Sequence, residues 1–328
     1  MYPHVASGPV SQGVSRALGY GVGLGAIAGL GTLAYSAGFE VRNFVLRRVE
    51  LNVLPAGHRP LKVLHIADLH LTPSQGMKRR WLASLADLEP DLVVNTGDNL
   101  AHQESVAPLV DGFGRLLDVP GVFVFGSNDY FAPTLRNPLW YLLPDDGRRA
   151  TWAAKLPWRD LRDAFEKGGW SNLTNSSARL EVGDTLFGFV GVDDPHLGYD
   201  DLAAVAGPAP TDVDLRIGVA HAPYLRVLDQ FARDGYDITF AGHTHGGQLC
   251  LPGAGALVTN CDLDTKRAKG LHRHPADAPE GAPGSSWLHV SAGLGTSPFA
   301  PVRFCCRPEA TLLTFTARPG FVGAASVG

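Results

Sequence analysis

The sequence has little cysteine, and its cysteines lack the spacings that mark a structural zinc site or a redox motif. Cys250, Cys261, Cys305 and Cys306 are the four, and no pair of them has C-x-x-C spacing. A disulfide between the adjacent Cys305 and Cys306 would be strained. We therefore expect four free thiols in or near the core, which favours a reducing compartment.

The sequence also lacks a long run of lysine and arginine. The formal net charge is −4 and the pI is about 6.3, so no basic surface is available to follow a phosphate backbone. We therefore exclude nucleic acid as a partner. No internal repeat is evident, and 328 residues suit one large α/β domain with an appendage.

Residues 17–38 form an uncharged stretch that is long enough to cross a bilayer as a helix. Gly21, Gly25 and Gly29 repeat at a spacing that is typical of packed membrane helices. We expect a single N-terminal membrane anchor, and the arginines after it place the rest of the chain in the cytoplasm. The alternative is a cleaved signal peptide that releases a secreted protein, although the stretch lacks a clear cleavage site.

Beyond this stretch, apolar runs alternate with amphipathic ones, which predicts βαβ units and a mostly parallel sheet. Strands are expected at 43–53, 61–67, 91–95, 121–125, 179–182, 185–190, 214–220, 237–241, 287–291 and 311–315. Helices are expected at 77–88, 104–117 and 158–168. Residues 139–155 predict a loop over the site, and residues 270–286, rich in Pro, Gly and Ala, predict a mobile loop. The expected organisation is an N-terminal segment (1–50), one α/β domain (51–318) and a tail (319–328).

Residues that can bind metal ions follow five of the predicted strands. They occur in Asp68-Leu69-His70, Gly97-Asp98-Asn99, Gly126-Ser127-Asn128-Asp129, the lone His221 and Gly242-His243-Thr244-His245. Ligands collect at the carboxyl ends of strands in α/β sheets, so one shared site is expected. Carboxylate, imidazole and amide ligands in this number suit two adjacent divalent ions, which can hold a phosphate and activate water.

The spacing inside these groups suggests how each residue contributes. Asp68 and His70 lie two apart on what we expect to be an extended segment, so both side chains point to one side. Asp98 follows a glycine that permits a tight turn, and its carboxylate is placed to bridge two ions. Each group is weak alone, because a lone Asp after glycine is usually a turn residue and a lone His is usually structural.

Together, these motifs resemble the calcineurin-like metallophosphoesterase superfamily, whose pattern is D-x-H, G-D, G-N-H-[DE], H and G-H-x-H. The resemblance covers about residues 61–316 and is greatest to the membrane-anchored bacterial branch of phosphodiesterase-like and UDP-2,3-diacylglucosamine hydrolase-like proteins. It implies an α/β fold, a four-layer α-β-β-α sandwich behind the anchor helix. It also implies two ions, one held by Asp68, His70, Asp98 and His245, the other by Asp98, Asn128, His221 and His243.

The chain departs from the superfamily pattern at one group. Where the pattern has G-N-H-[DE], the chain has Gly126-Ser127-Asn128-Asp129, and we interpret Asp129 as replacing the histidine that assists the leaving group. An ionised aspartate cannot donate a proton, whereas one with a raised pKa can. His102 and His196 are alternative proton donors or substrate contacts, and each is equally explained as a surface histidine.

We therefore expect a membrane-anchored phosphoesterase that hydrolyses a phosphodiester or pyrophosphate with a hydroxide bridging two Mn, Fe or Zn ions. The expected catalytic residues are Asp98, Asn128, Asp129 and His221. The anchor suggests a substrate linked to lipid or to the cell wall. The alternative function is a non-catalytic, metal-binding interaction module on the same fold.

Overall fold

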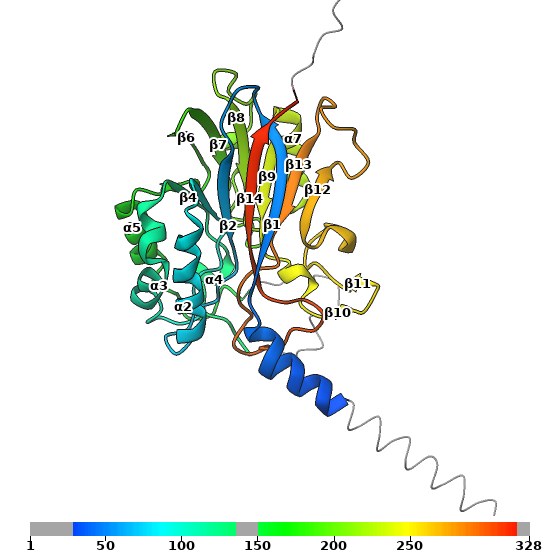
Figure 1. Ribbon diagram of the computed structural model, residues 1–328. Helices are drawn as coiled ribbons and strands as arrows, with labels where there is room; N and C mark the ends of the chain where they lie inside the picture. The colour runs from blue at the N-terminus through cyan, green and yellow to red at the C-terminus, as the bar shows by residue number, and fades with distance from the viewer. Residues whose placement is uncertain (1–28, 136–149, 320–328) are drawn as a thin grey trace, which may run out of the picture.

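The protein is described by a computed structural model that covers residues 29–135 and 150–319. Two six-stranded sheets pack face to face, and helices lie on their outer faces (Figure 1). The expected mixed α/β sandwich is confirmed, whereas the described residues do not support the expected anchor helix. The loop expected at 139–155 falls largely outside the described residues.

The first sheet has the strand order β1-β14-β2-β3-β4-β5. These strands are β1 (Val45–Leu54), β14 (Glu309–Ala317), β2 (Leu61–Ile66), β3 (Leu92–Asn95), β4 (Gly121–Phe123) and β5 (Ser171–Asn172). β14 is antiparallel to β2, and the other neighbouring pairs are parallel. β1 includes residues on both sides of the boundary expected at residue 50. The end of the N-terminal segment is therefore part of the first sheet.

The second sheet has the order β12-β13-β9-β8-β7-β6, and its two outer pairs are antiparallel hairpins. The strands are β6 (Ser176–Val182), β7 (Thr185–Gly191), β8 (Leu215–Val219), β9 (Ile238–Ala241), β12 (Gly270–His274) and β13 (Ser286–Val290). A separate short pair joins β10 (Cys250–Leu251) to β11 (Gly255–Ala256). The start of the expected loop at 270–286 is therefore a strand. The apolar Leu271 and Trp287 of this hairpin pack against the core between the sheets, which holds β12 in place.

The inner faces of the two sheets form the main core. The first sheet contributes residues such as Val63, Val94 and Leu313, while the second contributes residues such as Phe189, Ile217 and Phe240. These side chains are almost fully buried, and burying each one stabilises the fold by about 1.5–3 kcal/mol. A strand that is buried on both faces is apolar along its whole length, and for this reason these runs could be recognised in the sequence.

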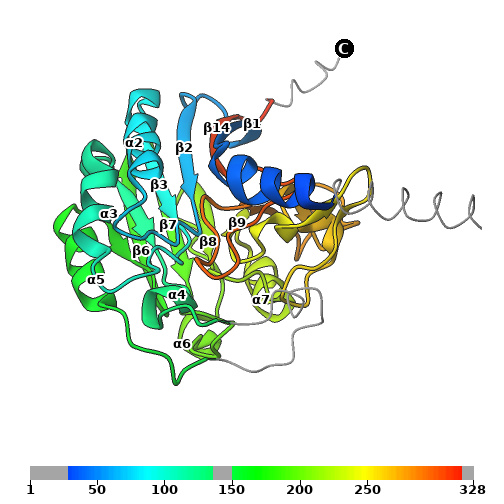
Figure 2. The ribbon, with the colours of Figure 1, turned by 90° about the horizontal axis from the view of Figure 1, so that it is seen from below.

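Helices cover both outer faces of the sandwich (Figure 2). The first sheet is covered by α2 (Gly76–Ser84), α3 (Val106–Phe113) and α5 (Trp158–Lys167), and the second by α7 (Leu225–Asp234). The shorter helical segments are η3 (Leu85–Leu88), η4 (Gly114–Asp118), α4 (Ser127–Tyr130), α6 (Leu202–Val205), η6 (His245–Gly247) and η7 (Thr265–Arg267). The helix α7 was not predicted, although its buried Leu228 and Phe231 follow the three-residue spacing of an apolar helix face.

The expected location at the cell membrane is wrong for the part of the chain that can be tested. In residues 29–135 and 150–319, no helix has the length and apolar character needed to cross a bilayer. Residues 17–28 of the expected span lie outside the described residues. The remainder continues into η1 (Tyr35–Phe39) and η2 (Glu40–Arg42), where Ser36 and Glu40 are buried against the protein.

Candidate metal centre

The predicted ligands lie at the carboxyl ends of strands from both sheets. In chain order they are Asp68 and His70 after β2, Asp98 after β3, Asn128 after β4, His221 after β8, and His243 and His245 after β9. The two sheets are joined here because the N–H of His243 donates to both carboxylate oxygens of Asp68, at 3.0 and 3.1 Å. The strand ends of both sheets therefore meet at one edge of the sandwich.

The backbone at this edge is strained. Five of the predicted ligands have left-handed φ angles: Asp68 (49°), His70 (40°), Asp98 (54°), His243 (69°) and His245 (50°). Such a conformation costs a residue other than glycine roughly 1–2 kcal/mol, and residues that adopt it cluster at functional sites. The Asp68–His70 segment is thus not extended as expected. Both residues instead have a left-handed φ, and one ligand atom of each lies within 4.8 Å of the other.

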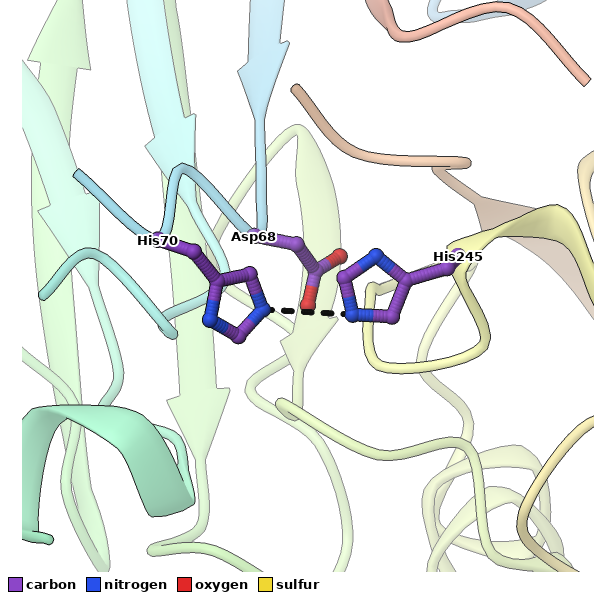
Figure 3. A group of neighbouring side chains, drawn as sticks. All are labelled: Asp68, His70 and His245. Carbon is purple, nitrogen blue, oxygen red and sulfur yellow. Dashed lines mark hydrogen bonds between the residues drawn. The ribbon is translucent and has the colours of Figure 1, made fainter. Parts of the chain in front are cut away.

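Asp68, His70 and His245 form a first cluster, in which one ligand atom of each residue lies within 4.8 Å of the others (Figure 3). His70 Nε2 and His245 Nε2 face each other at 3.2 Å. Two imidazole nitrogens that bind the same ion at about 2.1 Å lie about 3 Å apart. This cluster therefore has the donor spacing of a metal site.

A second cluster contains Asp68, Asp98 and His221, again with ligand atoms within 4.8 Å of one another. Asp98 Oδ2 lies 3.5 Å from His221 Nε2 and also 3.5 Å from His70 Nε2. One carboxylate oxygen thus lies between a histidine of each cluster. The Asp98 carboxylate also lies close to the backbone of Gly126. A larger residue does not fit there, because a Cβ on residue 126 would lie 2.4 Å from Asp98 Oδ1.

Backbone carbonyls fix the orientation of two histidine rings. His221 Nδ1 lies 2.7 Å from the Thr96 carbonyl oxygen, and His245 Nδ1 lies 3.2 Å from that of Gly295. Since a carbonyl only accepts, each Nδ1 carries a proton, and in the neutral ring each Nε2 then has its lone pair toward the cluster. His221 Nε2 is buried and has no hydrogen-bond partner within the described residues. A buried nitrogen of this kind is the group that a metal ion satisfies.

Burial and neighbouring charges shift the pKa values of the cluster. Burial lowers the pKa of His70 to about 4 and raises the pKa of Asp68 to about 7. Burial also acts to lower the pKa of His221, but the carboxylates of Asp98, Asp194 and Asp68 outweigh it and raise that pKa to about 9. The buried carboxylates therefore need a positive charge beside them, which a proton on His221 or a divalent cation supplies.

Asn128 and Asp129 both act on the turn that carries Asp98. Asn128 donates to the Asp98 carboxylate through its backbone N–H at 2.7 Å and through Nδ2 at 3.1 Å. The Asp129 carboxylate accepts the backbone N–H groups of Asp98 and Asn99, each at 2.8 Å, and of Gly126 at 3.0 Å. The contacts of Asp129 are those of a residue that positions Asp98.

The ring of His243 lies beside the second cluster. It lies edge-on to the His221 ring, with 5.2 Å between centroids. Its Nε2 lies 3.1 Å from the carbonyl oxygen of Asn260, which requires the proton on Nε2 and leaves the lone pair on Nδ1.

The two histidines considered as substrate contacts lie in different places. The ring centroid of His196 lies 4.4 Å from that of His243, and its Nδ1 hydrogen-bonds the Tyr224 hydroxyl at 3.2 Å. His102 is exposed, and its Nδ1 accepts the N–H of Glu104 at 3.1 Å. Only His196 is therefore brought to the candidate metal centre by the contacts of the described residues.

Asp194 is a buried residue at the centre that was not among the predicted ligands. Its Oδ1 accepts the N–H of His196 at 2.9 Å, whereas its Oδ2 is buried without a partner among the described residues. Its charge contributes to the raised pKa of His221. The sequence signal was the pair Asp193-Asp194 just after a predicted strand, the same context as the other groups.

Arg303 is fully buried behind the first cluster and was also not predicted. Its guanidinium donates to the carbonyl oxygens of Ala292 at 2.7 Å, Gly293 at 3.1 Å and Gly295 at 2.7 Å. It also donates to the carbonyl oxygen of His245 at 3.4 Å. Arg303 thus holds both the backbone of His245 and the carbonyl that orients its ring.

The fold and these clusters agree with the comparison to known families. The profile of the calcineurin-like phosphoesterase family matches residues 61–247, more than half of the chain, and the protein belongs to this family. It is therefore a metal-dependent phosphoester hydrolase by family.

Two curated relatives match most of their own length. The metallophosphoesterase YkuE of Bacillus subtilis is 24% identical over 279 residues, which cover 81% of this chain and 82% of the relative. The phosphodiesterase YaeI of Escherichia coli is 24% identical over 294 residues, which cover 86% and 94%. The similarity therefore extends over nearly the whole chain and includes all the strands that carry the clusters.

Proposed function

We propose that the protein hydrolyses phosphodiesters with two divalent ions bound side by side at the edge of the sandwich. The observation that carries the proposal is the position of Asp98 Oδ2, at 3.5 Å from both His70 Nε2 and His221 Nε2. A carboxylate oxygen between two histidine clusters is the arrangement that a bridging ligand requires. The name of the Escherichia coli relative supports a phosphodiester as the substrate class.

The residues present fit two ions. One would be held by Asp68, His70, Asp98 and His245, and the other by Asp98, Asn128, His221 and His243. When bound, such ions activate water near pH 7 and offset the charge that develops on the phosphoryl oxygens. A mixed set of oxygen and nitrogen donors suits Mn, Fe and Zn and does not select one of them.

The protein contributes by holding these donors in place before the substrate arrives. The carbonyls of Thr96 and Gly295 hold the rings of His221 and His245, so little reorganisation is needed when an ion binds. The His196 ring, which lies against His243, is placed to contact a phosphoryl or leaving-group oxygen. The expected substrate linked to lipid or cell wall depended on the membrane anchor, and it is not part of this proposal.

The proposal is tested with the purified full chain and a chromogenic diester, bis(4-nitrophenyl) phosphate. After chelation and dialysis, Mn²⁺ is added back while turnover and bound metal are measured together. We expect no turnover without metal and full turnover near two ions per chain. Full turnover with one ion per chain would contradict the dinuclear assignment. Two bound ions without turnover of any diester would support the non-catalytic interaction module instead.

A further inference from the structure

Two of the four cysteines meet directly behind the turn that carries His245. Cys250 lies in β10 and Cys306 lies in the loop before β14, and their side chains are 5% and 1% exposed. They pack together with Ala292 in a small buried cluster. Neither has a part in the proposed hydrolysis, and neither belongs to a C-x-x-C motif.

The two thiols are direct neighbours. Both sulfurs lie beside the carbonyl oxygen of Gly246, Cys250 Sγ at 3.3 Å and Cys306 Sγ at 3.5 Å, and both side chains belong to the same buried cluster. Two cations face the Cys306 sulfur, with Lys269 Nζ at 3.6 Å and Arg303 Nη1 at 3.8 Å. A cation beside a cysteine sulfur favours the thiolate, which is the form that attacks a peroxide.

We propose that Cys250 and Cys306 form a reversible disulfide when the protein meets a peroxide. One sulfur attacks a peroxide oxygen, the O–O bond breaks, and a sulfenic acid and one water are formed. The second thiol then attacks the sulfenic sulfur, the S–S bond forms, and a second water leaves. The two sulfurs are oxidised, hydrogen peroxide is reduced to two waters, and an added dithiol reverses the reaction.

The disulfide would act on the turn that carries His245. An S–S bond of about 2.05 Å draws the sulfurs closer than two thiols that are not bonded, so one of the two segments has to move. The Cys306 segment is held, because Glu40 Oε1 accepts the Cys306 N–H at 2.6 Å and Arg303 donates to the Cys306 carbonyl at 3.3 Å. The bond also removes the thiol donor that lies 3.3 Å from the His245 carbonyl. The His245 turn is therefore the part that shifts.

The test of the disulfide compares three chains: the native protein, Cys305→Ser and Cys250→Ser. Each is treated with hydrogen peroxide, its remaining thiols are alkylated, and its peptides are analysed by mass spectrometry. We expect a peptide that links position 250 to position 306 in the native protein and in Cys305→Ser, lost after dithiol treatment and absent from Cys250→Ser. The exposed Cys305 adjoins Cys306 in sequence, so Cys305→Ser identifies the linked sulfur. Absence of the link from Cys305→Ser, or a link to Cys261 in its place, would overturn the proposal.

The effect on the metal site rests on the proposed function, in which His245 is a metal ligand. In Cys305→Ser, we expect the fully cross-linked form to bind Mn²⁺ at least about 10-fold more weakly than the reduced form, measured by titration calorimetry. Equal affinities would overturn the coupling between the thiols and the His245 turn. Absence of Mn²⁺ binding in both forms would count against the proposed function and would leave the mapped disulfide standing.

Discussion

At the residue scale, Asp98 is the carboxylate on which most of the centre depends. One of its oxygens accepts the N–H of Asn128, and the other lies between His70 and His221. Its own N–H is held by Asp129. A single side chain thus lies beside residues that follow strands of both sheets and, by our proposal, bridges two ions.

The first prediction follows from this position. Asp98→Asn removes one negative charge that serves both proposed ions, so both should be lost or weakened. We expect turnover of the nitrophenyl diester to fall by at least about 100-fold, together with a fall in bound metal measured by elemental analysis. Asp111→Asn, a change at an exposed aspartate of α3, is the matched control and should retain both. Two ions per chain with normal turnover in Asp98→Asn would rule out the bridging role.

The second prediction concerns Asp129, which the sequence suggested as a stand-in for a proton-donating histidine. Its carboxylate accepts three backbone N–H groups, and burial, followed by the charge of Asp98, raises its pKa to about 7. Asp129→His cannot accept these bonds and should disturb Asp98. We therefore expect turnover to fall by about 10–100-fold on alkyl and nitrophenyl diesters alike. A selective gain on alkyl diesters would show instead that the position supplies a proton.

The third prediction separates His196 from His102. The His196 ring packs against His243, whereas His102 is exposed and bonded to its own turn. We expect His196→Asn to lower kcat on the alkyl diester by about 10²-fold or more, the usual loss for a general acid or base. His102→Asn should stay within about two-fold of the native rate. Equal rates for the two variants would remove His196 from the proposed centre.

The expected metal ligands could be predicted from the sequence because they follow strand-like runs and lie next to glycines. The residues that support these ligands could not be predicted. Arg303 was missed because arginine is rarely buried, and its partners Ala292 and Gly295 offer only backbone carbonyls, which leave no mark in sequence. Asp194 was not assigned a role because the pair Asp193-Asp194 matches none of the five ligand groups. Its significance depends on burial beside His221, which only the assembled sheets create.

At the scale of secondary structure, apolar runs predicted most strands of both sheets, since strands buried on both faces are apolar throughout. The helix α7 was missed because polar and apolar residues are equally frequent in it, so only the spacing of its buried face identifies it. β12 was missed for a different reason. Leu271 is its only large apolar residue, so β12 has no apolar run, and it forms a strand by pairing with β13.

The fourth prediction concerns a buried pair that joins the two sheets. His65 of β2 and His289 of β13 face each other through Nδ1 at 2.8 Å, and His65 Nε2 hydrogen-bonds Thr96 Oγ1 at 3.1 Å. Burial lowers both pKa values, that of His289 to about 3. A histidine with a depressed folded pKa contributes stability that is present above its unfolded pKa of about 6.5 and is lost as pH falls through 6.5 toward 3.

We therefore expect the free energy of unfolding to fall by about 1.4 kcal/mol per pH unit for each of these histidines below pH 6.5. The measurement is urea denaturation between pH 7 and pH 4 with a chelator present, so that metal release does not contribute. His289→Gln removes one titrating ring and should show a shallower dependence on pH. An unchanged slope in this variant would assign the acid sensitivity to other groups.

At the scale of the whole molecule, the described N-terminal segment belongs to the same body as the candidate metal centre. Figure 1 shows residues 29–42 at the end of the sandwich that also carries α4. The carbonyl of Ser36 accepts the N–H of Arg303 at 3.2 Å, and Arg307 Nη2 donates to Asn43 Oδ1 at 2.7 Å. Through Arg303, this segment supports the backbone that holds His245.

The last prediction uses this arrangement to compare two shortened chains. A chain that begins at Asn43 keeps all of β1 and the bond to Arg307, whereas one that begins at Leu51 loses residues 45–50, which pair with 309–314 of β14. Without them β14 becomes an open edge, which favours aggregation. We expect the shorter chain to melt at least about 10 °C below the longer one, the effect of several kcal/mol in a domain of this size. Circular dichroism gives the melting temperatures, and light scattering detects aggregation. Equal melting temperatures and equal solubility would mean that the first half of β1 adds nothing to the stability of the sandwich.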